Sequence, residues 1–469
     1  MAQIKFGTDG WRAIIARDFT FANVERVAQA YADYLVQSSG VTPFVVVGFD
    51  RRFLSENFAQ RAAEIMTGNG FRVALFAEAQ PTPLISWAVK DLHATGGIMI
   101  TASHNPANFN GFKIKAPWGG SASPETTSVV EQLVDQNPPT RRVFTEQTAE
   151  LLEPSIKRYR EQIAAYIDLE RISSTDAGTI VDPMHGSGGL WVESFIKGGK
   201  LKVETIRANR DPLFGGVHPE PIDQNLGVLK KRVVETSAVV GLATDGDADR
   251  VGAVDETGRT LTMHDVVPML LLHLSRTRKM SGAVVVTVSQ SVLTKRIANA
   301  FGFKIHETPI GFKYVADLML KEDILLGAEE SGGIGVKGHI PERDGVLNSL
   351  LFLEAIVSAG KRPSEMLRDL HREFGEFYFG RRDLHVPVSR GQELVNRLGE
   401  NAPDSLAGYP VTDVQTLDGA KLIFGDESWM LFRQSGTEPM LRIYAEATSV
   451  EKMQMLLDAG AEVAKTQLS

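Results

Sequence analysis

Short apolar runs recur along this chain, and each ends abruptly in a turn of small, polar or acidic residues. The runs are rich in β-branched residues and do not alternate with polar ones, which predicts strands buried on both faces, as in parallel sheets. Helical patterns lie between them, as at residues 23–37 and 55–69. Alternation of strand and helix indicates α/β units. The runs with their turns are VVVGFD (45–50), GGIMITASHNP (96–106), TIVDPMHGSGG (179–189), VVGLATDGDADR (239–250), VVVTVSQS (284–291) and ILLGAEESGG (324–333).

Ligands of open α/β sheets bind beyond the carboxyl ends of the strands, which is where this chain places its polar turns. The six turns are therefore the candidate loops for chemistry. The last hundred residues differ: short strands over 383–446 and a helical pattern at 449–465 predict a small antiparallel α+β domain. The paired prolines of NPPTRR (137–142) disfavour a helix and predict a linker.

Bulk properties exclude several classes of protein. A net charge of −8 offers no basic surface for nucleic acid or an anionic membrane, and no apolar run approaches the roughly 20 residues that span a bilayer. The opening MAQIKFGTDGWR lacks the apolar core of a signal peptide, and a chain without cysteine has no disulfide or thiolate metal site. We expect a cytoplasmic protein with three or four domains in 469 residues.

The turn TDGDADR (244–250) places Asp245, Asp247 and Asp249 at every second position after a predicted strand. Three carboxylates with open positions suit a hard cation such as Mg²⁺ that also binds a phosphate. A calcium loop of the EF-hand type is excluded, because Arg250 stands where that loop needs glycine and the flank is a strand. The alternative is a solvated acidic turn.

Ser103 lies beside His104 in TASHNPANFNGFKIK (101–115). Adjacency in sequence does not orient a histidine for a catalytic triad, and the G-x-S-x-G elbow is absent. An ordinary serine turn is one interpretation. The other is a phosphorylated Ser103, whose roughly −1.5 to −2 charges would add a fourth oxygen ligand to the metal of the aspartate turn. Under that interpretation the serine is a carrier.

Three further stretches offer groups for an anion or a sugar. LFRQSGTEPMLR (431–442) combines arginines, hydroxyls and a glycine-containing turn that could wrap a phosphate. It does not have the spacing of a P-loop. The alternative is an ordinary hairpin turn. GAEESGG (327–333) could hold sugar hydroxyls, or be a solvated turn. FGTDGWR (6–12) brings Arg12 toward a phosphate, or is a surface turn.

The order TASHNP, DGDADR, EESGG, RQSGTEP, after the opening FGTDGWR, resembles the α-D-phosphohexomutase family over essentially the whole chain. The resemblance implies an α/β protein of four domains around a central cleft: three similar α/β sandwiches and a smaller C-terminal antiparallel α+β domain. The domains would hold the phosphoserine, metal, sugar and phosphate loops, in that order, over residues 1–145, 146–252, 253–372 and 373–469.

That family interconverts the 1-phosphate and 6-phosphate of a hexose through a bound 1,6-bisphosphate. The resemblance therefore implies small-molecule hexose phosphates as partners, and Mg²⁺ and glucose 1,6-bisphosphate as cofactor and intermediate. Either end of the sugar phosphate must face Ser103 in turn. We therefore expect the 1,6-bisphosphate to reverse its orientation without leaving the enzyme, and the last domain to move as it does so.

The resemblance also implies a role for each matching residue. Ser103 would be the phosphoserine and, with Asp245, Asp247 and Asp249, a metal ligand. The remaining assignments are Arg12, His104, Lys113 and Arg250 as basic groups near the phosphoserine, Glu329, Glu330 and Ser331 for the sugar hydroxyls, and Arg433, Ser435, Gly436, Thr437 and Arg442 for the phosphate that is not reacting.

The sugar loop indicates the substrate. Its EES resembles the version of glucose-specific members, whereas mannose-capable relatives more often have Met at position 330 and glucosamine mutases more often have Gln. Gly333 stands where those relatives carry a histidine to which proton transfer is sometimes assigned, so the general acid and base stay open among His104, Lys113, Lys313 and His339. Ala248 replaces a commoner glycine, and we expect little effect on the metal.

The main hypothesis is a Mg²⁺-dependent mutase that interconverts α-D-glucose 1-phosphate and glucose 6-phosphate. Within the family, a mannose-capable or dual mutase and a glucosamine mutase are alternatives. A synthase that makes glucose 1,6-bisphosphate from another phosphoryl donor, and a sugar-phosphate-binding protein without activity, represent other classes. The oligomeric state stays open.

Overall fold

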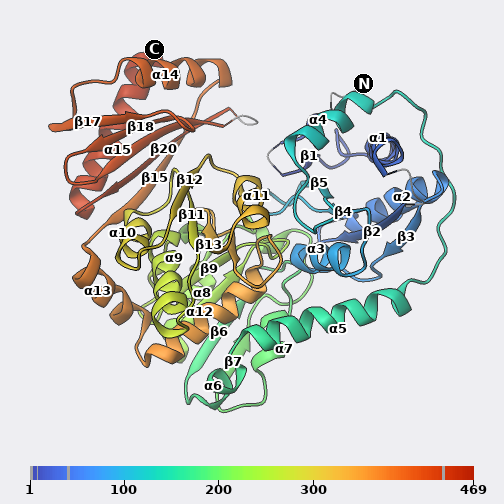
Figure 1. Ribbon diagram of the computed structural model, residues 1–469, viewed down its shortest axis with the longest axis horizontal. Helices are drawn as coiled ribbons and strands as arrows, with labels where there is room; N and C mark the ends of the chain where they lie inside the picture. Colours follow the sequence, from blue (N-terminus) through green and yellow to red (C-terminus); the bar gives the residue numbers. More distant parts are fainter. Residues whose placement is uncertain (1–3, 8, 40–42, 436–438, 469) are drawn as a thin grey trace. The chain divides into compact units, whose positions relative to one another are not determined.

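The computed structural model describes residues 4–7, 9–39, 43–435 and 439–468 (Figure 1). The chain forms two compact units, each built from separate stretches of sequence. The first comprises Met1–Leu261, Ala316–Glu322 and Ser331–Ser364, and the second comprises Thr262–Val315, Asp323–Glu330 and Glu365–Ser469. Among the described helices, none is both long and apolar enough to cross a membrane.

The first sheet of the first unit has the order β1-β5-β4-β2-β3. Val45 and Val47 of β2 point to one face of the sheet and belong to the core cluster under α1 and α2. Gly48 lies on the opposite face, against α3, where an added Cβ would lie 2.3 Å from Ile85. Because side chains alternate between the faces of a strand, helices cover both faces. The elements are β1 (Trp11–Ile14), α1 (Phe21–Ser39), β2 (Phe44–Phe49), α2 (Ser55–Gly68), β3 (Arg72–Leu75), α3 (Thr82–Asp91), β4 (Gly96–Ile100), β5 (Phe109–Lys115) and α4 (Pro124–Leu133).

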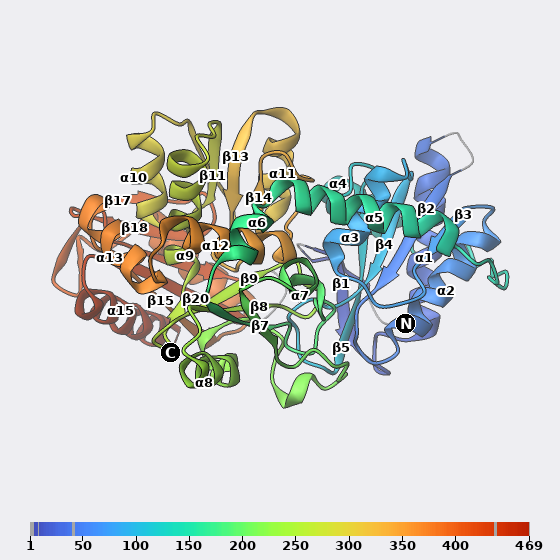
Figure 2. The same cartoon turned by 90° about the horizontal axis from the view of Figure 1, so that it is seen from below.

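The second sheet has the order β10-β9-β8-β6-β7, with α8 and α12 packed on its two faces (Figure 2). Its core strand β8 is buried along its whole length. The remaining elements of this unit are α5 (Ala149–Tyr166), α6 (Leu169–Ser174), β6 (Gly178–Asp182), α7 (Trp191–Ile196), β7 (Lys202–Thr205), α8 (Gly227–Thr236), β8 (Val240–Thr244), β9 (Val251–Asp255), β10 (Thr260–Leu261), β14 (Ile334–Val336) and α12 (Gly345–Ala359).

The two sheets of the first unit are mixed: the apolar runs expected to pair in parallel do so, as at β2–β4 and β6–β8, while the edge pairs β1–β5 and β9–β10 are antiparallel. β2 pairs in parallel with β3 and β4, and β6 with β7 and β8, but β4–β5 and β8–β9 are antiparallel. The connections at 101–108 and 245–250 are too short for the crossover that parallel neighbours need. The serine turn and the aspartate turn are these two short connections.

The second unit contains a parallel three-strand arrangement and an antiparallel sheet. β11 pairs in parallel with β12 and β13, and the antiparallel sheet has the order β15-β20-β19-β18-β17-β16, with α14 and α15 packed against it. Its elements are α9 (Met263–Leu272), β11 (Ala283–Thr287), α10 (Val292–Ala300), β12 (Ile305–Thr308), β13 (Ile324–Ala328), β15 (Tyr378–His385), α14 (Val388–Glu400), β16 (Ser405–Leu406), β17 (Tyr409–Gln415), β18 (Ala420–Phe424), β19 (Trp429–Gln434), β20 (Met440–Ala447) and α15 (Val450–Leu468), while α11 (Phe312–Lys321) and α13 (Pro363–Phe374) have residues in both units.

The predicted fold class, three α/β domains and a C-terminal antiparallel α+β domain, is confirmed. The first of the short strands predicted over 383–446 is displaced. β15 begins at Tyr378 and ends at His385, because Pro387 precedes a helix that starts at Val388. A proline fits the position before a helix but cannot donate a ladder hydrogen bond within a strand.

Lys421 of β18 is a buried cation in the second unit. Its Nζ donates to the carbonyl of Val288 at 2.6 Å, lies 3.4 Å from Glu307 Oε1 and sits 4.5 Å above the ring of Trp429. Burial, with a smaller contribution from Lys295, lowers the pKa of Lys421 to about 8. The charged lysine therefore destabilises the folded protein at neutral pH.

This pKa predicts a rise in stability in alkaline solution. Between pH 8 and about 10.4, the ordinary pKa of lysine, the unfolded chain binds the Lys421 proton that the folded chain has lost. The free energy of unfolding should therefore rise through this window, by about 2 kcal/mol from this group. Denaturant unfolding of the wild type and of Lys421→Met at pH 7.5 and 10 measures the difference. An equal change in both proteins would contradict the assignment.

Candidate active site

Ser103 follows β4 in a strained turn of the first unit. Its backbone φ is +51°, in the left-handed region that non-glycine residues rarely adopt, and the residue is buried. The Ser103 N–H donates to Thr101 Oγ1 at 2.9 Å, and the hydroxyl donates to Asp245 Oδ2 at 2.8 Å. The fold therefore joins the serine turn to the aspartate turn.

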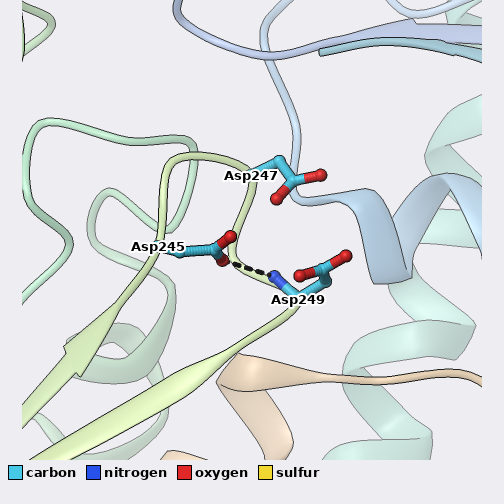
Figure 3. Close-up of side chains that lie close together, drawn as sticks. All are labelled: Asp245, Asp247 and Asp249. Atoms are coloured by element: carbon cyan, nitrogen blue, oxygen red, sulfur yellow. Dashed lines mark hydrogen bonds between the residues drawn. The ribbon is translucent and has the colours of Figure 1, made fainter. Parts of the chain in front are cut away.

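The aspartate turn follows β8 and brings its three carboxylates together (Figure 3). Asp245, Asp247 and Asp249 are fully buried, and one oxygen from each lies within 4.8 Å of the others. Asp245 Oδ1 also accepts the N–H groups of Asp249 at 3.0 Å and Arg250 at 3.1 Å, which shape the turn. Ala248 adopts φ +57°, which explains physically why a glycine is favourable there.

The carboxylates fit a metal ion. Asp247 Oδ1 and Asp249 Oδ1 are buried and accept no hydrogen bond from any described residue. Burial, together with repulsion from Asp247 and Asp249, raises the pKa of Asp245 well above its ordinary value. Buried carboxylate oxygens without partners are costly, and a cation among them would remove that cost. The donors are oxygen only, as hard cations prefer.

Two cations reach the same carboxylates from other parts of the unit. Lys113 Nζ of β5 lies 2.9 Å from Asp247 Oδ2, 3.2 Å from Asp249 Oδ2 and 2.9 Å from Asp9 Oδ2. Arg343 lies 2.9 Å from Asp249 Oδ2 and 2.7 Å from Asp9 Oδ2. Burial opposes the charge of Lys113, but the three carboxylates outweigh it and raise the pKa of Lys113. Lys113 is therefore charged at neutral pH.

Three other predicted basic residues lie around this cluster. Arg12 donates to Asn105 Oδ1 at 2.6 Å and lies 4.0 Å from Asp9. His104 Nδ1 lies 3.4 Å from Ser103 Oγ. The Arg250 guanidinium lies 3.8 Å from Glu220 and 4.0 Å from Asp249 Oδ1. The first unit thus brings all the predicted phosphoserine and metal residues together.

The other two proton-transfer candidates lie in different surroundings. The His339 side chain is 1% exposed, with Nε2 2.9 Å from Asp344 Oδ2, an atom that also accepts from Tyr159 at 2.7 Å. Lys313 Nζ sits 5.1 Å above the ring of Tyr314. His339 is thus part of a buried structural cluster that caps α12.

The predicted sugar loop divides between the two units. Glu329 and Glu330 follow β13 in the second unit, whereas Ser331 belongs to the first. Glu329 is buried, and Glu330 Oε2 accepts from Ser289 Oγ at 2.6 Å. Ser289 comes from the turn after β11, another of the six candidate loops.

The predicted phosphate loop joins β19 and β20 in the second unit. Arg433 and Arg442 stand directly opposite each other in this antiparallel pair, so their side chains share one face. Arg433 Nε donates to Asp418 Oδ2 at 2.9 Å, and the Ser435 N–H donates to the carbonyl of Met440. Two neighbouring arginines suit an anion. Gly436 and Thr437 lie outside the described residues.

Several further residues of the site were not among those that the sequence indicated. Asp9 lies in FGTDGWR, yet local sequence did not indicate that it would bridge Lys113 and Arg343. Thr82 donates to Asp247 Oδ2 at 2.7 Å from the start of α3. Arg343 and Thr82 lie far from the aspartates in sequence and belong to no local motif, so only the fold reveals them.

Comparisons with known proteins cover nearly the whole chain. Family models described as phosphoglucomutase/phosphomannomutase match in order: alpha/beta/alpha domain I over residues 3–141, domain II over 157–258, domain III over 264–374, and the C-terminal domain over 386–463.

Individual relatives agree with these matches. The chain is 32% identical to a phosphoglucomutase/phosphomannomutase of Thermococcus kodakarensis over 99% of each chain, and 31% identical to a phosphoglucosamine mutase of Halorhodospira halophila over 97% of this chain and 94% of the relative. A crystal structure of a putative phosphomannomutase from Thermus thermophilus is 36% identical, covers 99% of both chains and superposes with a TM-score of 0.86.

Proposed function

This chain belongs to the phosphoglucomutase/phosphomannomutase family, and we propose that it interconverts glucose 1-phosphate and glucose 6-phosphate with Ser103 as the phosphoryl carrier. Family membership makes it a phosphohexomutase, an isomerase that transfers a phosphoryl group between two positions of a hexose phosphate. The observation that carries the role of Ser103 is the 2.8 Å hydrogen bond from its hydroxyl to Asp245, inside a buried cluster of three carboxylates.

The aspartates would hold Mg²⁺, with a phosphoryl oxygen on Ser103 as a further ligand. Bound there, Mg²⁺ supplies positive charge against the phosphoryl oxygens. Lys113 and Arg343 carry fixed positive charge on the same side, and Asp9 holds both of them in place. Lys113 lies against Asp9, Asp247 and Asp249, and its ammonium would neutralise charge there.

The transfer moves one phosphoryl group in each half-reaction. A sugar hydroxyl oxygen attacks the phosphorus on Ser103, the bond from phosphorus to Ser103 Oγ breaks, and the hydroxyl proton passes to a base. The 1,6-bisphosphate then presents its other phosphate to Ser103, and the reverse steps regenerate the phosphoserine. His104, 3.4 Å from Ser103 Oγ, is the proposed proton carrier in the first unit.

The second unit would supply the groups that hold the rest of the substrate. Arg433, Arg442 and Ser435 would bind the phosphate that is not reacting, with Asp418 fixing the Arg433 side chain. Glu329 and Glu330 would accept hydrogen bonds from sugar hydroxyls. Gly436, Thr437 and Ser331 keep their predicted roles, and division of the domains near residues 145, 252 and 372 remains a prediction.

The choice of sugar is the point that most needs a test, because the relatives are named for glucose, mannose and glucosamine phosphates. The EES loop favours glucose. We expect kcat/KM for glucose 1-phosphate to be roughly ten- to a hundredfold higher than for mannose 1-phosphate or glucosamine 1-phosphate. A ratio of this size corresponds to one hydrogen bond left unsatisfied in the transition state. The assay compares the three 1-phosphates with Mg²⁺ and a trace of each 1,6-bisphosphate.

Glu330→Gln is the matched variant and should reduce the preference for glucose. Equal rates with glucose and mannose would make the enzyme a dual mutase, and a higher rate with glucosamine would overturn the choice of glucose but not the chemistry. Accumulation of 1,6-bisphosphate from 1,3-bisphosphoglycerate, without isomerisation, would instead identify a synthase.

A further inference from the structure

Arg52 is a buried cation that no step of the proposed mechanism uses. It follows β2 in the first unit, and its side chain is fully buried. The guanidinium donates to four backbone carbonyls, three in the turn that carries Ser103 and one at the first residue of β5. These are Ser103 O at 2.6 Å, Asn105 O at 2.7 Å, Pro106 O at 2.8 Å and Phe109 O at 3.1 Å.

Asp50 holds the start of the same turn, at Thr101. Its carboxylate pairs with Arg52 Nε at 3.1 Å and accepts the Thr101 hydroxyl at 2.6 Å and the Ser55 hydroxyl at 2.8 Å. Thr101 Oγ1 in turn accepts the N–H of Ser103. The backbone of Ser103 is thus held on both sides, at its N–H through Thr101 and at its carbonyl by Arg52.

The turn needs such support because Ser103 has a positive φ. A non-glycine residue in the left-handed region costs about 1–2 kcal/mol and persists only where its surroundings impose it. One planar guanidinium reaches several acceptors in fixed directions, whereas a lysine ammonium is a compact point donor. The four carbonyl bonds therefore depend on arginine in particular.

We propose that Arg52 is a positioning residue for phosphoryl transfer: its guanidinium holds residues 103–109 so that the Ser103 hydroxyl stays against the aspartates in both half-reactions. The proposal rests on the proposed carrier role of Ser103. A purely structural arginine would affect the amount of folded enzyme but not the rate of each folded molecule.

The test is the split between kcat and KM in Arg52→Lys. We expect kcat to fall about a hundredfold, the cost of a small misplacement of a reacting group, while KM for the hexose 1-phosphate changes by less than about threefold. The matched control is Arg51→Lys, since the neighbouring Arg51 donates instead to the carbonyl of Ala208. Wild-type kcat in folded Arg52→Lys would overturn the proposal.

Chemical rescue separates positioning from general damage. In Arg52→Ala, millimolar guanidinium should restore part of kcat, whereas methylammonium should not, because it cannot span several carbonyls. Failure of guanidinium to rescue a folded variant would overturn the proposal.

If neither Arg52 variant folds, Thr101→Val decides. It removes the acceptor of the Ser103 N–H without changing side-chain size, and wild-type kcat there would overturn the proposal. Failure of the carrier role itself would appear differently, as a wild type that forms no phosphoserine by ³¹P NMR.

Discussion

Ser103→Ala should abolish mutase turnover, by about a millionfold, the scale seen when an essential nucleophile is removed. The Ser103 hydroxyl is the proposed site of the transferred phosphoryl group, and alanine offers no oxygen to carry it. Substrate binding should persist, because Arg433 and Arg442, proposed to bind the phosphate, lie in the second unit. Coupled assays would measure turnover, and calorimetry with a hexose phosphate would measure binding.

Ser174→Ala is the control for this variant, since Ser174 is exposed and donates only to the carbonyl of Arg171 among described groups. It should retain wild-type turnover. Substantial activity in Ser103→Ala, with purified protein free of wild type, would eliminate the carrier role and require direct transfer between substrates.

Asp247→Asn should lower kcat by about a thousandfold and weaken Mg²⁺ binding. The substitution changes only one of the two carboxylate oxygens. Thr82 and Lys113 both donate to Asp247 Oδ2, and the amide oxygen of asparagine can accept these bonds in its place. Oδ1, which accepts no hydrogen bond from a described residue, is replaced by an NH₂ group. The variant therefore loses one oxygen ligand for the metal but keeps its packing. Because a metal ion stabilises the charge of the transferring phosphoryl group by several kcal/mol, the loss of a ligand should lower kcat. Titration of activity with Mg²⁺ measures both effects.

The surface variant Asp176→Asn controls for the loss of one negative charge, because Asp176 is exposed. Its Mg²⁺ dependence should match the wild type. An Asp247→Asn enzyme with an unchanged Mg²⁺ titration would remove Asp247 from the ligand set. Thermal shift with and without Mg²⁺ gives a readout that does not depend on activity: added metal should raise the Tm of the wild type more than that of the variant.

The correct sequence predictions concern local patterns. Uninterrupted apolar runs predicted buried strands, and the polar turns after two of them hold the serine and the carboxylates that the structure brings together. Asp245, Asp247 and Asp249 come from one turn, so their alternate spacing already indicated a cluster of carboxylates. The predicted antiparallel last domain likewise followed from short strands joined by turns.

Local sequence patterns did not predict all of the strand pairing or the contacts between residues far apart in the chain. The predicted apolar strands pair in parallel with one another, as at β2–β4 and β6–β8, but local patterns did not indicate the antiparallel neighbours that follow the short turns at 101–108 and 245–250. Ala248 adopts a positive φ, a backbone conformation that the sequence did not indicate, while its expected small effect on a metal stays a prediction. Local sequence does not report φ or the register of a distant strand.

The sequence by itself determined the chemical groups of this protein: a serine on one turn, three carboxylates on another, and the apolar strands that end at both. Only the tertiary structure decided how these groups meet. It places Ser103 Oγ 2.8 Å from Asp245, sets Lys113 and Arg343 against the aspartates, and locks the serine turn with Arg52. Spacing along a chain determines side chains within one turn, whereas contacts between distant turns depend on how whole sheets pack.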